Sequence, residues 1–382
     1  MLNNKKKLLI LVDWFAPGYK AGGPIQSCVN ICAALKEQYQ IYVLTTDTDH
    51  GETVPYSGIK SNEWVYNESL CANIFYIQKK TFKAAQLIDQ IVQVDADFIY
   101  LNHLFSPRFV VLPLWLKWTG RLRGKVIVCP RGALYDSALS LKYYKKMPLL
   151  NLYKWLGIHR KITFHATNLR ERQAISKYFP GSKILVADNL PDACQPDFKT
   201  CVKERGKLSC IFIARIVPIK NLFFLLQILQ QVKVDILLTI VGPVEDIAYW
   251  EFCKEAIQHL PDNIIVKYAG SVHKSELSIL IQQHHLFVLP TTGENFGHAI
   301  FEALLCGRPV LISDQTPWLQ LAEKNIGWDL PLSVPDKFSK IIEQMAAANQ
   351  EVFDIYANAA WQYAHHFIES NKTKNQYANL FS

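Results

Sequence analysis

The sequence predicts an α/β protein made of two Rossmann-like domains, each a doubly wound parallel sheet with helices on both faces. Three observations lead to this prediction: a length of 382 residues, an alternation of short apolar runs with helical periodicity, and a turn-rich stretch near the middle of the chain. A typical domain has about 100 to 200 residues. We expect the two domains to face each other across a central cleft, because open α/β sheets bind ligands beyond the carboxyl ends of their strands.

Apolar runs locate the expected strands, and helical periodicity fills the segments between them. In the first half, strands are expected at 8–12, 41–45, 98–101, 126–129, 163–166 and 184–186, with helices at 25–35, 84–92 and 170–178. In the second half, strands are expected at 210–213, 236–241, 264–268, 286–289 and 310–313. Strands that alternate with helices favour parallel sheets. Residues 189–198 contain two prolines and several turn formers, which is typical of a linker.

The composition indicates a globular cytoplasmic protein. Half of the residues are hydrophobic and 19% are charged. The apolar runs are too short to cross a membrane, and the run after Lys5 is interrupted by Asp13 before it can serve as a signal peptide. Nine cysteines without CxxC spacing predict neither a disulfide framework nor a zinc site.

Positive charge is concentrated in the first half of the chain. Residues 108–183 contain sixteen Lys and Arg but only two acidic residues, whereas the net charge of the whole chain is +8. Trp, Tyr and Leu are mixed with these cations, which favours contact with an anionic membrane surface. A solvated cationic face remains an alternative. No nucleic-acid-binding module accompanies the charge, so we expect no nucleic acid partner.

The most informative segment runs from Pro290 to Leu304. It follows the apolar strand at 286–289, passes through a loop with Glu294, and enters a helix at Gly297 that carries Glu302. Backbone N–H groups in the first turn of such a helix bind anions, so a diphosphate is expected there. A carboxylate in the helix can accept bonds from two ribose hydroxyls. We therefore expect a nucleotide sugar in this place.

Other candidate residues also follow expected strands. Arg215 and Lys220 follow the strand at 210–213 and can hold two phosphates. Gly22 and Gly23 open the first expected helix and suit close approach of a ligand, although an ordinary turn explains them equally well. His103 suits a sugar contact or a general base, and a structural histidine is the commoner alternative. Arg131 suits an anionic substrate or the solvent, and His298 suits the ligand or helix packing.

These residues resemble the retaining glycosyltransferases of the GT-B fold, in particular family 4, the glycosyl transferases group 1. Glu294 and Glu302 match the E-x7-E pattern of that family, and Phe296-Gly297 lies within it. Arg215 and Lys220 match its Arg/Lys pair, and Gly307-Arg-Pro-Val310 matches the segment that follows the pattern. In the first half, Gly22-Gly23, His103 and residues 130–132 resemble acceptor-side loops.

The resemblance implies a metal-independent hexosyl- or related glycosyltransferase that retains anomeric configuration and needs no cofactor. It implies an acceptor-binding domain at 1–190, a nucleotide-sugar-binding domain at 191–361, and a C-terminal helix at about 362–382 that packs back on the first domain. The implied catalytic residues are Arg215, Lys220, Glu294 and His103. The implied donor-binding residues are Gly22, Gly23, Val272, Asn295, Phe296, Gly297, His298 and Glu302, with Arg131 on the acceptor side.

The implied pathway is the assembly of cell-surface polysaccharide, lipopolysaccharide or glycolipid on the inner face of the membrane. The partners would be a nucleotide-sugar donor and a glycan or lipid-linked acceptor. Two alternatives stay open: a sugar-nucleotide epimerase of the same architecture, and a non-catalytic nucleotide-sugar-binding subunit. The sequence leaves open the nucleobase, the sugar, the acceptor, the linkage and the oligomeric state.

Overall fold

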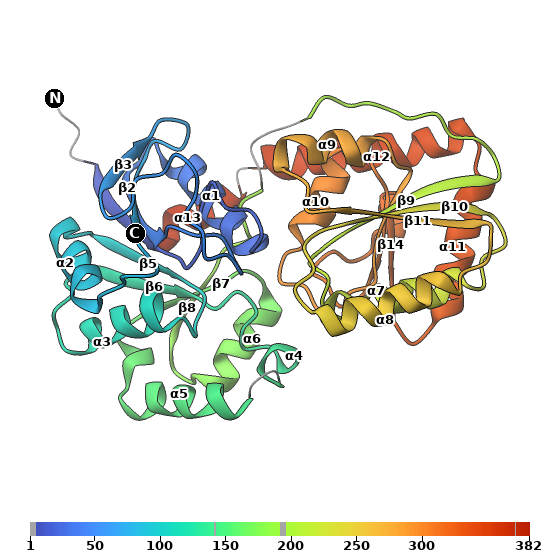
Figure 1. Cartoon of the computed structure of the whole chain (residues 1–382). Helices are drawn as coiled ribbons and strands as arrows, with labels where there is room; N and C mark the ends of the chain where they lie inside the picture. The colour runs from blue at the N-terminus through green and yellow to red at the C-terminus, as the bar shows by residue number, and fades with distance from the viewer. Residues whose placement is uncertain (1–4, 141–142, 192–195, 371) are drawn as a thin grey trace. The chain divides into compact units, whose positions relative to one another are not determined.

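The computed structural model describes residues 5–140, 143–191, 196–370 and 372–382, and the chain divides into two compact units (Figure 1). Unit 1 comprises Met1–Ala193 and Asn371–Ser382, and unit 2 comprises Cys194–Ser370. The chain therefore returns to unit 1 at its end. The tail forms two helices, α12 (Gln350–Glu369) in unit 2 and α13 (Lys372–Leu380) in unit 1. The linker expected at 189–198 lies partly outside the described residues.

Unit 1 contains an eight-stranded sheet in the order β3-β4-β2-β1-β5-β6-β7-β8. The strands are β1 (Lys6–Leu11), β2 (Tyr39–Thr46), β3 (Trp64–Asn67), β4 (Ala72–Ile77), β5 (Phe98–Asn102), β6 (Lys125–Cys129), β7 (Thr163–Ala166) and β8 (Lys183–Val186). All neighbours pair in parallel except β3 and β4. The helices are α1 (Gly23–Leu35), α2 (Ala84–Val94), α3 (Leu112–Trp118), α4 (Asp136–Ser140), α5 (Tyr143–Trp155), α6 (Leu169–Tyr178) and α13.

Alternate residues of β1 reach two separate cores in unit 1, which explains why helices cover both faces of the sheet. Leu8 and Ile10 pack with α1 and α13, whereas Leu9 and Leu11 pack with α2, α3, α5 and α6. A strand buried on both faces is a continuous apolar run, which is the pattern that the sequence carries at this place.

Unit 2 contains a six-stranded sheet, parallel throughout, in the order β11-β10-β9-β12-β13-β14. The strands are β9 (Lys207–Ile213), β10 (Asp235–Val241), β11 (Ile264–Gly270), β12 (Leu286–Leu289), β13 (Val310–Ser313) and β14 (Gly327–Leu330). The helices are α7 (Leu222–Leu229), α8 (Ile247–Gln258), α9 (Lys274–Gln282), α10 (His298–Leu305), α11 (Pro335–Ala347) and α12. Helices α7 and α8 cover one face of this sheet, and α9, α10 and α12 cover the other (Figure 1).

The predicted fold class is thus confirmed: both units are α/β with parallel sheets. Three strands, β3, β4 and β14, were not predicted. β3 and β14 have only four residues each and lie at sheet edges, where partial exposure weakens the apolar signal. β4 carries Asn73 inside its run.

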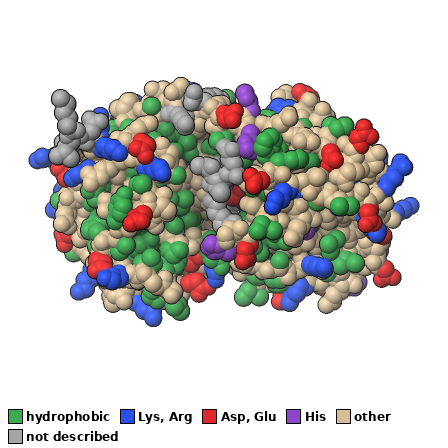
Figure 2. Space-filling model, turned by 90° about the horizontal axis from the view of Figure 1, so that it is seen from above, with side chains coloured by type: hydrophobic (Ala, Val, Ile, Leu, Met, Phe, Trp, Pro, Cys, Tyr) green, Lys and Arg blue, Asp and Glu red, His purple; other side chains and the backbone are tan. Residues whose placement is uncertain are grey.

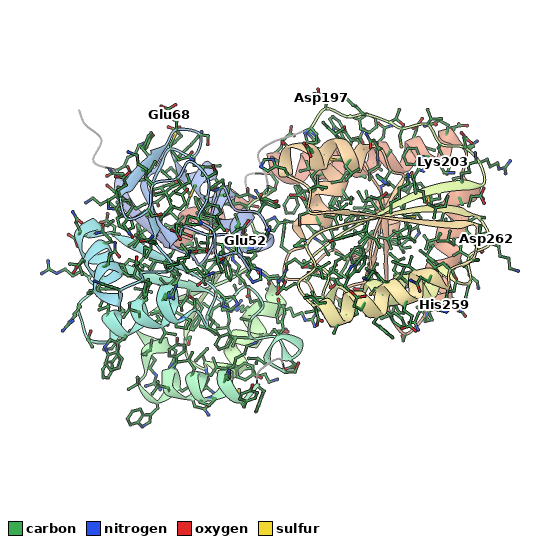
Figure 3. All side chains as sticks on the ribbon, in the orientation of Figure 1. Glu52, Glu68, Asp197, Lys203, His259 and Asp262 are labelled. Atoms are coloured by element: carbon green, nitrogen blue, oxygen red, sulfur yellow. The ribbon has the colours of Figure 1, made fainter. Side chains whose placement is uncertain are left out.

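Two buried cations of unit 2 form hydrogen bonds between segments that are distant in the sequence. Lys203, labelled in Figure 3, donates from Nζ to the carbonyls of Ala346 (2.9 Å) and Ala348 (3.1 Å), where α11 ends. Arg308 is fully buried and donates to the carbonyls of Lys199 (2.7 Å) and Gln282 (2.6 Å). Because buried carbonyls require hydrogen-bond donors, and these bonds tie the ends of α9 and α11 to other segments, both side chains serve the fold.

Candidate active site

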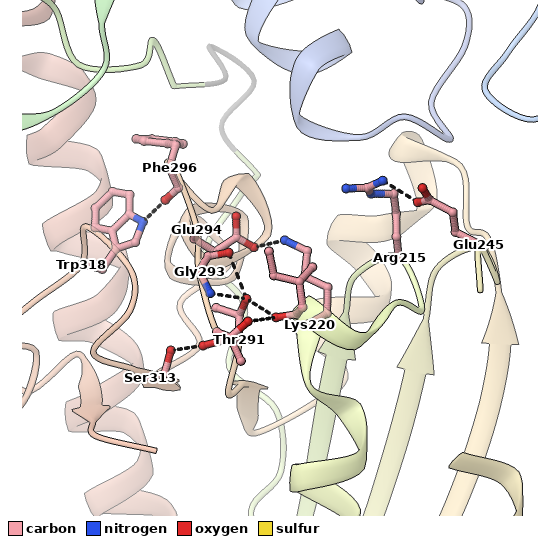
Figure 4. A network of polar contacts seen from close by, with 11 residues as sticks. Arg215, Lys220, Glu245, Thr291, Gly293, Glu294, Phe296, Ser313 and Trp318 are labelled. Carbon is pink, nitrogen blue, oxygen red and sulfur yellow. Dashed lines mark hydrogen bonds and ion pairs between the residues drawn. The ribbon is translucent and has the colours of Figure 1, made fainter. Parts of the chain in front are cut away.

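In unit 2 the candidate residues gather where the strand order reverses. β9 has β10 on one side and β12 on the other, and the chain leaves β10 and β12 in opposite directions along the sheet. Loops beyond the carboxyl ends of two such strands diverge and leave a crevice that suits a ligand. The loops after β9 and β12 carry Arg215, Lys220 and Glu294, and Figure 4 draws their polar contacts.

The loop after β9 is held against the loop after β10 by backbone contacts. Ile216 donates from its N–H to the carbonyl of Pro243 (2.8 Å). A Cβ on Gly242 would lie 1.9 Å from the carbonyl oxygen of Ala214, so this close approach requires glycine. Arg215 follows Ala214 directly and forms an ion pair with Glu245, with both side chains about one third exposed. The geometry of the backbone therefore brings Arg215 and Glu245 together.

The loop after β12 is fastened to the loop after β9 through one carbonyl group. The oxygen of Ile219 accepts from the Thr291 hydroxyl (2.9 Å), the Thr292 N–H (2.8 Å) and the Thr292 hydroxyl (3.2 Å). The next residue, Lys220, forms an ion pair with Glu294, and the two side chains are only 14% and 15% exposed. The predicted cation and the predicted carboxylate are therefore direct neighbours.

The N-terminus of α10 lies at the end of the same loop. Gly297 caps this helix with φ 79° and has no side chain that could accept a hydrogen bond from the first turn. The preceding residue, Phe296, is buried, its carbonyl accepts from the Trp318 indole, and its ring contacts that of Trp318. The first turn of α10 has no acidic residue. The helix start is thus fixed in position and electropositive.

The remaining predicted residues of unit 2 lie around this loop. Asn295 lies in the loop, and His298 begins α10, where its ring contacts Phe296 at 4.9 Å between centroids. Glu302 lies in the second turn of α10 and is half-buried. Val272 lies between β11 and α9 and packs against the apolar core.

In unit 1 the predicted residues likewise follow strands at a reversal of strand order, here between β1 and β5. Gly22 caps α1 with φ 66°, and Gly23 is the first residue of that helix. His103 follows β5 with φ 88°, and Arg131 follows β6 with φ 56°. Both conformations are uncommon for residues with a side chain, which marks these loops as constrained.

His103 is held as a neutral imidazole. Its Nδ1 accepts a hydrogen bond from the Phe105 N–H (3.2 Å), which leaves the proton on Nε2. Burial and, to a smaller extent, the nearby Lys146 lower the pKa of His103 to about 4. At neutral pH this side chain is therefore a hydrogen-bond donor through Nε2.

Arg131 belongs to a network inside unit 1. Its guanidinium donates to Asn102 Oδ1 (2.7 Å), to Asn189 Oδ1 and to the Tyr100 hydroxyl (3.0 Å). The Tyr100 hydroxyl contacts His165 Nδ1 at 2.8 Å, and His165 Nε2 contacts the carbonyl of Ala187 at 2.8 Å. The network joins the ends of β5 and β6 to the segment after β8.

Sequence reasoning missed two carboxylates at these sites. Glu245 pairs with Arg215, and its position after β10, the neighbour of β9, was the available signal. Asp13 follows β1 and accepts from the Ser106 hydroxyl (2.8 Å), which joins the loops after β1 and β5. Burial raises the pKa of Asp13. Asp13 was noted in the sequence only as a break in an apolar run.

Comparisons with known proteins agree with this architecture. Residues 197–360, within unit 2, match the family model described as glycosyl transferases group 1. Sucrose-phosphate synthase from Thermosynechococcus elongatus has a similar structure, with a TM-score of 0.72, 15% identity, and coverage of 99% of this chain and 98% of that chain. HepE from Anabaena, solved with UDP and glucose, matches with a TM-score of 0.68, 16% identity, and coverage of 98% and 99%.

TarM from S. aureus matches with a TM-score of 0.68 and 13% identity over 99% of each chain. No curated protein matches the sequence. Among the helices of the described residues, none is long and apolar enough to span a bilayer. Residues 197–360 thus match the glycosyl transferases group 1, and the chain with its two α/β units has the GT-B fold.

Proposed function

We propose that this protein transfers a sugar from a nucleotide-sugar donor to an acceptor hydroxyl, with retention of anomeric configuration and without a metal ion or cofactor. One observation supports this proposal most strongly. Two cation–carboxylate pairs, Lys220–Glu294 and Arg215–Glu245, lie at the reversal point of the unit 2 sheet, in the loops after β9, β10 and β12, and the loop after β12 leads to the start of α10. This combination of fixed cations and a helix N-terminus suits a diphosphate.

The chemistry of the reaction explains why such a site accelerates it. When the bond between the sugar carbon and the diphosphate oxygen breaks, negative charge grows on the leaving diphosphate. Arg215 and Lys220 would stabilise this charge more strongly in the transition state than in the bound donor. The leaving phosphate oxygen would take the proton of the acceptor hydroxyl, and the acceptor oxygen would then bond to the same face of the sugar. Glu294 would bind the sugar hydroxyls, and Glu302 the ribose.

Similar structures support the donor and acceptor classes that we propose. HepE was solved with UDP-glucose and TarM with UDP, so we propose a uridine diphosphate hexose as the first donor to test. WaaG, which takes part in lipopolysaccharide biosynthesis, has a similar fold with a TM-score of 0.66. We propose a glycan or lipid-linked acceptor and a peripheral position on the inner face of the membrane. His103 remains a predicted catalytic residue, Gly22 and Gly23 remain predicted donor-binding residues, and Arg131 remains a predicted residue of the acceptor side.

A nucleotide panel tests the donor proposal directly. Thermal unfolding is measured with UDP, GDP and ADP, and the sugar nucleotides of the stabilising base are then incubated with the protein in EDTA. We expect one diphosphate to raise the Tm, and we expect slow hydrolysis that releases the sugar with its original anomeric configuration by NMR. Rearrangement of the donor without hydrolysis or transfer would instead indicate an epimerase. Tight binding without turnover on any acceptor would indicate a binding subunit.

The ribose role of Glu302 has a test of its own. Replacing Glu302 by Ala removes an acceptor for two hydroxyl groups, so the Kd of the nucleoside diphosphate is expected to rise by about tenfold or more. Glu351→Ala, at an exposed position in α12, is the matched control and should leave the Kd unchanged. An unchanged Kd in Glu302→Ala, measured by calorimetry, would remove Glu302 from the ribose site.

A further inference from the structure

Many cations of the basic region 108–183 have partners within unit 1. Lys117 Nζ donates to the carbonyls of residues 122, 123 and 124, and Lys125 Nζ donates to the carbonyl of Ser382 (2.9 Å). Lys177 pairs with Asp136 at 3.1 Å. The region is therefore not one uniform charged surface. A contact with a partner is expected only where exposed cations meet exposed apolar side chains.

Helix α5 has such a face. Tyr144, Leu152 and Trp155 are spaced for one side of a helix, and Tyr144 and Trp155 are 72% and 82% exposed. Leu150 and Tyr153, on the other side of α5, are buried in the core of unit 1. Single exposed apolar residues are ordinary on protein surfaces, but a row of large ones on one helix face indicates an interaction site.

Helix α3 extends this face. The Trp118 indole donates to the carbonyl of Leu156 (3.0 Å), next to Trp155, and its ring lies 5.0 Å from that of Trp115. Trp115 is itself half exposed. We call the exposed side chains of Trp115, Tyr143, Tyr144, Leu152 and Trp155 the α3–α5 surface. The contacts between the two helices make it continuous.

The charge around the α3–α5 surface has one sign. Residues 112–161 contain eleven Lys and Arg and one acidic residue, Asp136. Arg121 and Arg123 are exposed just after α3, and Lys145 is exposed within α5. Figure 2 shows the face of unit 1 that lies away from α5, and there Lys and Arg side chains are intermixed with Asp and Glu. Large aromatics with cations and almost no carboxylates suit the headgroup region of an anionic bilayer.

We propose that the α3–α5 surface lies on an anionic lipid bilayer, with Tyr144 and Trp155 among the headgroups and the nearby cations against lipid phosphates. The first turns of α5 also reach the loop of His103, because Lys146 Nζ lies 5.4 Å from the centroid of the Phe105 ring. Binding in this way brings the bilayer beside the loop of His103, which resembles an acceptor-side loop. This inference rests on the peripheral membrane position in the proposed function and names the surface for it, whereas the transfer of sugar from the donor does not depend on it.

Vesicle flotation of the full chain tests this proposal. Phosphatidylcholine vesicles with and without phosphatidylglycerol are compared at low and high salt. We expect binding only to the anionic vesicles, weakened by salt. We expect Leu152→Ala with Trp155→Ala, and separately Lys145→Glu with Lys154→Glu, to reduce the partition coefficient at least about tenfold. Circular dichroism and thermal unfolding check that the variants fold.

Tyr66→Ala is the matched control, because Tyr66 is an exposed aromatic residue on β3, an edge strand of the unit 1 sheet. It should bind vesicles like the parent protein. No binding to anionic vesicles, or equal binding by the parent protein and both double variants, would overturn the proposal. A dimer in solution that the same variants dissociate would assign the surface to a second copy instead. Hydrolysis of the donor in the absence of lipid should be unchanged in every variant, so loss of that activity concerns the proposed function and not the surface.

Discussion

The two units carry polar groups at corresponding places in their sheets, but they use their cations differently. In unit 2, Lys220 and Arg215 each pair with a carboxylate, Glu294 or Glu245. In unit 1, Arg131 donates to neutral acceptors on Asn102, Asn189 and Tyr100. A phosphate can replace a carboxylate as the partner of a cation, whereas the acceptors of Arg131 connect the strands of the fold. The partner of a cation therefore tells more about its role than its position at a strand end.

The largest effect is expected from Lys220→Ala. Removing a fixed cation from a site that stabilises a departing diphosphate is expected to lower kcat by about a hundredfold or more. Lys254→Ala is the control, because Lys254 forms an ion pair of 2.7 Å with Glu251 on the surface of α8. Initial rates of sugar transfer by both variants provide the measurement. Near-normal turnover in Lys220→Ala, with native unfolding behaviour, would refute the phosphate role of Lys220.

Arg131→Ala is expected to act on stability. It removes three hydrogen bonds and leaves the acceptors of Tyr100, Asn102 and Asn189 without that donor, at a cost of about 3 kcal/mol. Arg172→Ala, at an exposed position in α6, is the control and should change stability by less than about 0.5 kcal/mol. Urea unfolding followed by circular dichroism measures both. Unchanged stability together with weaker acceptor binding would show that Arg131 binds a ligand, as we propose for the cations of unit 2.

Acid is expected to weaken unit 1 through its histidines. Burial lowers the pKa of His165 to about 3 and that of His103 to about 4, below the ordinary value of about 6.5. As the pH falls below 6.5, these histidines bind protons in the unfolded chain but not in the folded chain. The free energy of unfolding therefore decreases between pH 6.5 and pH 4. Each histidine contributes up to about 1.4 kcal/mol per pH unit in this window. Between pH 6.5 and pH 4, the urea concentration at the unfolding midpoint should fall less steeply with pH in His165→Gln than in the parent protein. An identical slope would contradict the low pKa of His165.

The smallest effect is expected from Glu245→Gln. This change removes the carboxylate that competes with a phosphate for Arg215, so a nucleoside diphosphate should bind more tightly. Since both side chains are about one third exposed, the gain should not exceed about fivefold. Calorimetric titration measures the Kd of the nucleoside diphosphate, with Glu251→Gln in α8 as the control. Weaker binding would show that Glu245 positions Arg215 for the ligand.

Much of the fold could be predicted because the strands of a parallel sheet are buried on both faces. Runs such as Leu286–Leu289 are apolar throughout and end at turn residues, so periodicity alone locates them. The four-residue edge strand β3 could not be found in this way. Three of its four residues are half-buried and Tyr66 is exposed, and its pairing depends on β4 lying beside it.

The sequence placed Lys220 and Glu294 in loops after strands, but it could not predict that they form an ion pair. That contact depends on the Thr291 and Thr292 hydroxyls meeting the carbonyl of Ile219, about seventy residues away in the chain. The same limit applies to Arg131. Its loop was located correctly, but its three acceptors come from β5 and from the segment after β8. Local patterns locate strand ends, whereas the partners at those ends depend on the tertiary fold.

The single carbonyl of Ile219, which accepts three hydrogen bonds, has a consequence for the speed of ligand capture. It locks the backbone beside Lys220 before any ligand arrives, so only side chains have to change partners when a diphosphate enters. Rotamer exchange takes nanoseconds, whereas loop rearrangement takes microseconds or longer. Stopped-flow association with unit 2 should therefore be a single phase whose rate rises linearly with nucleotide concentration and shows no plateau.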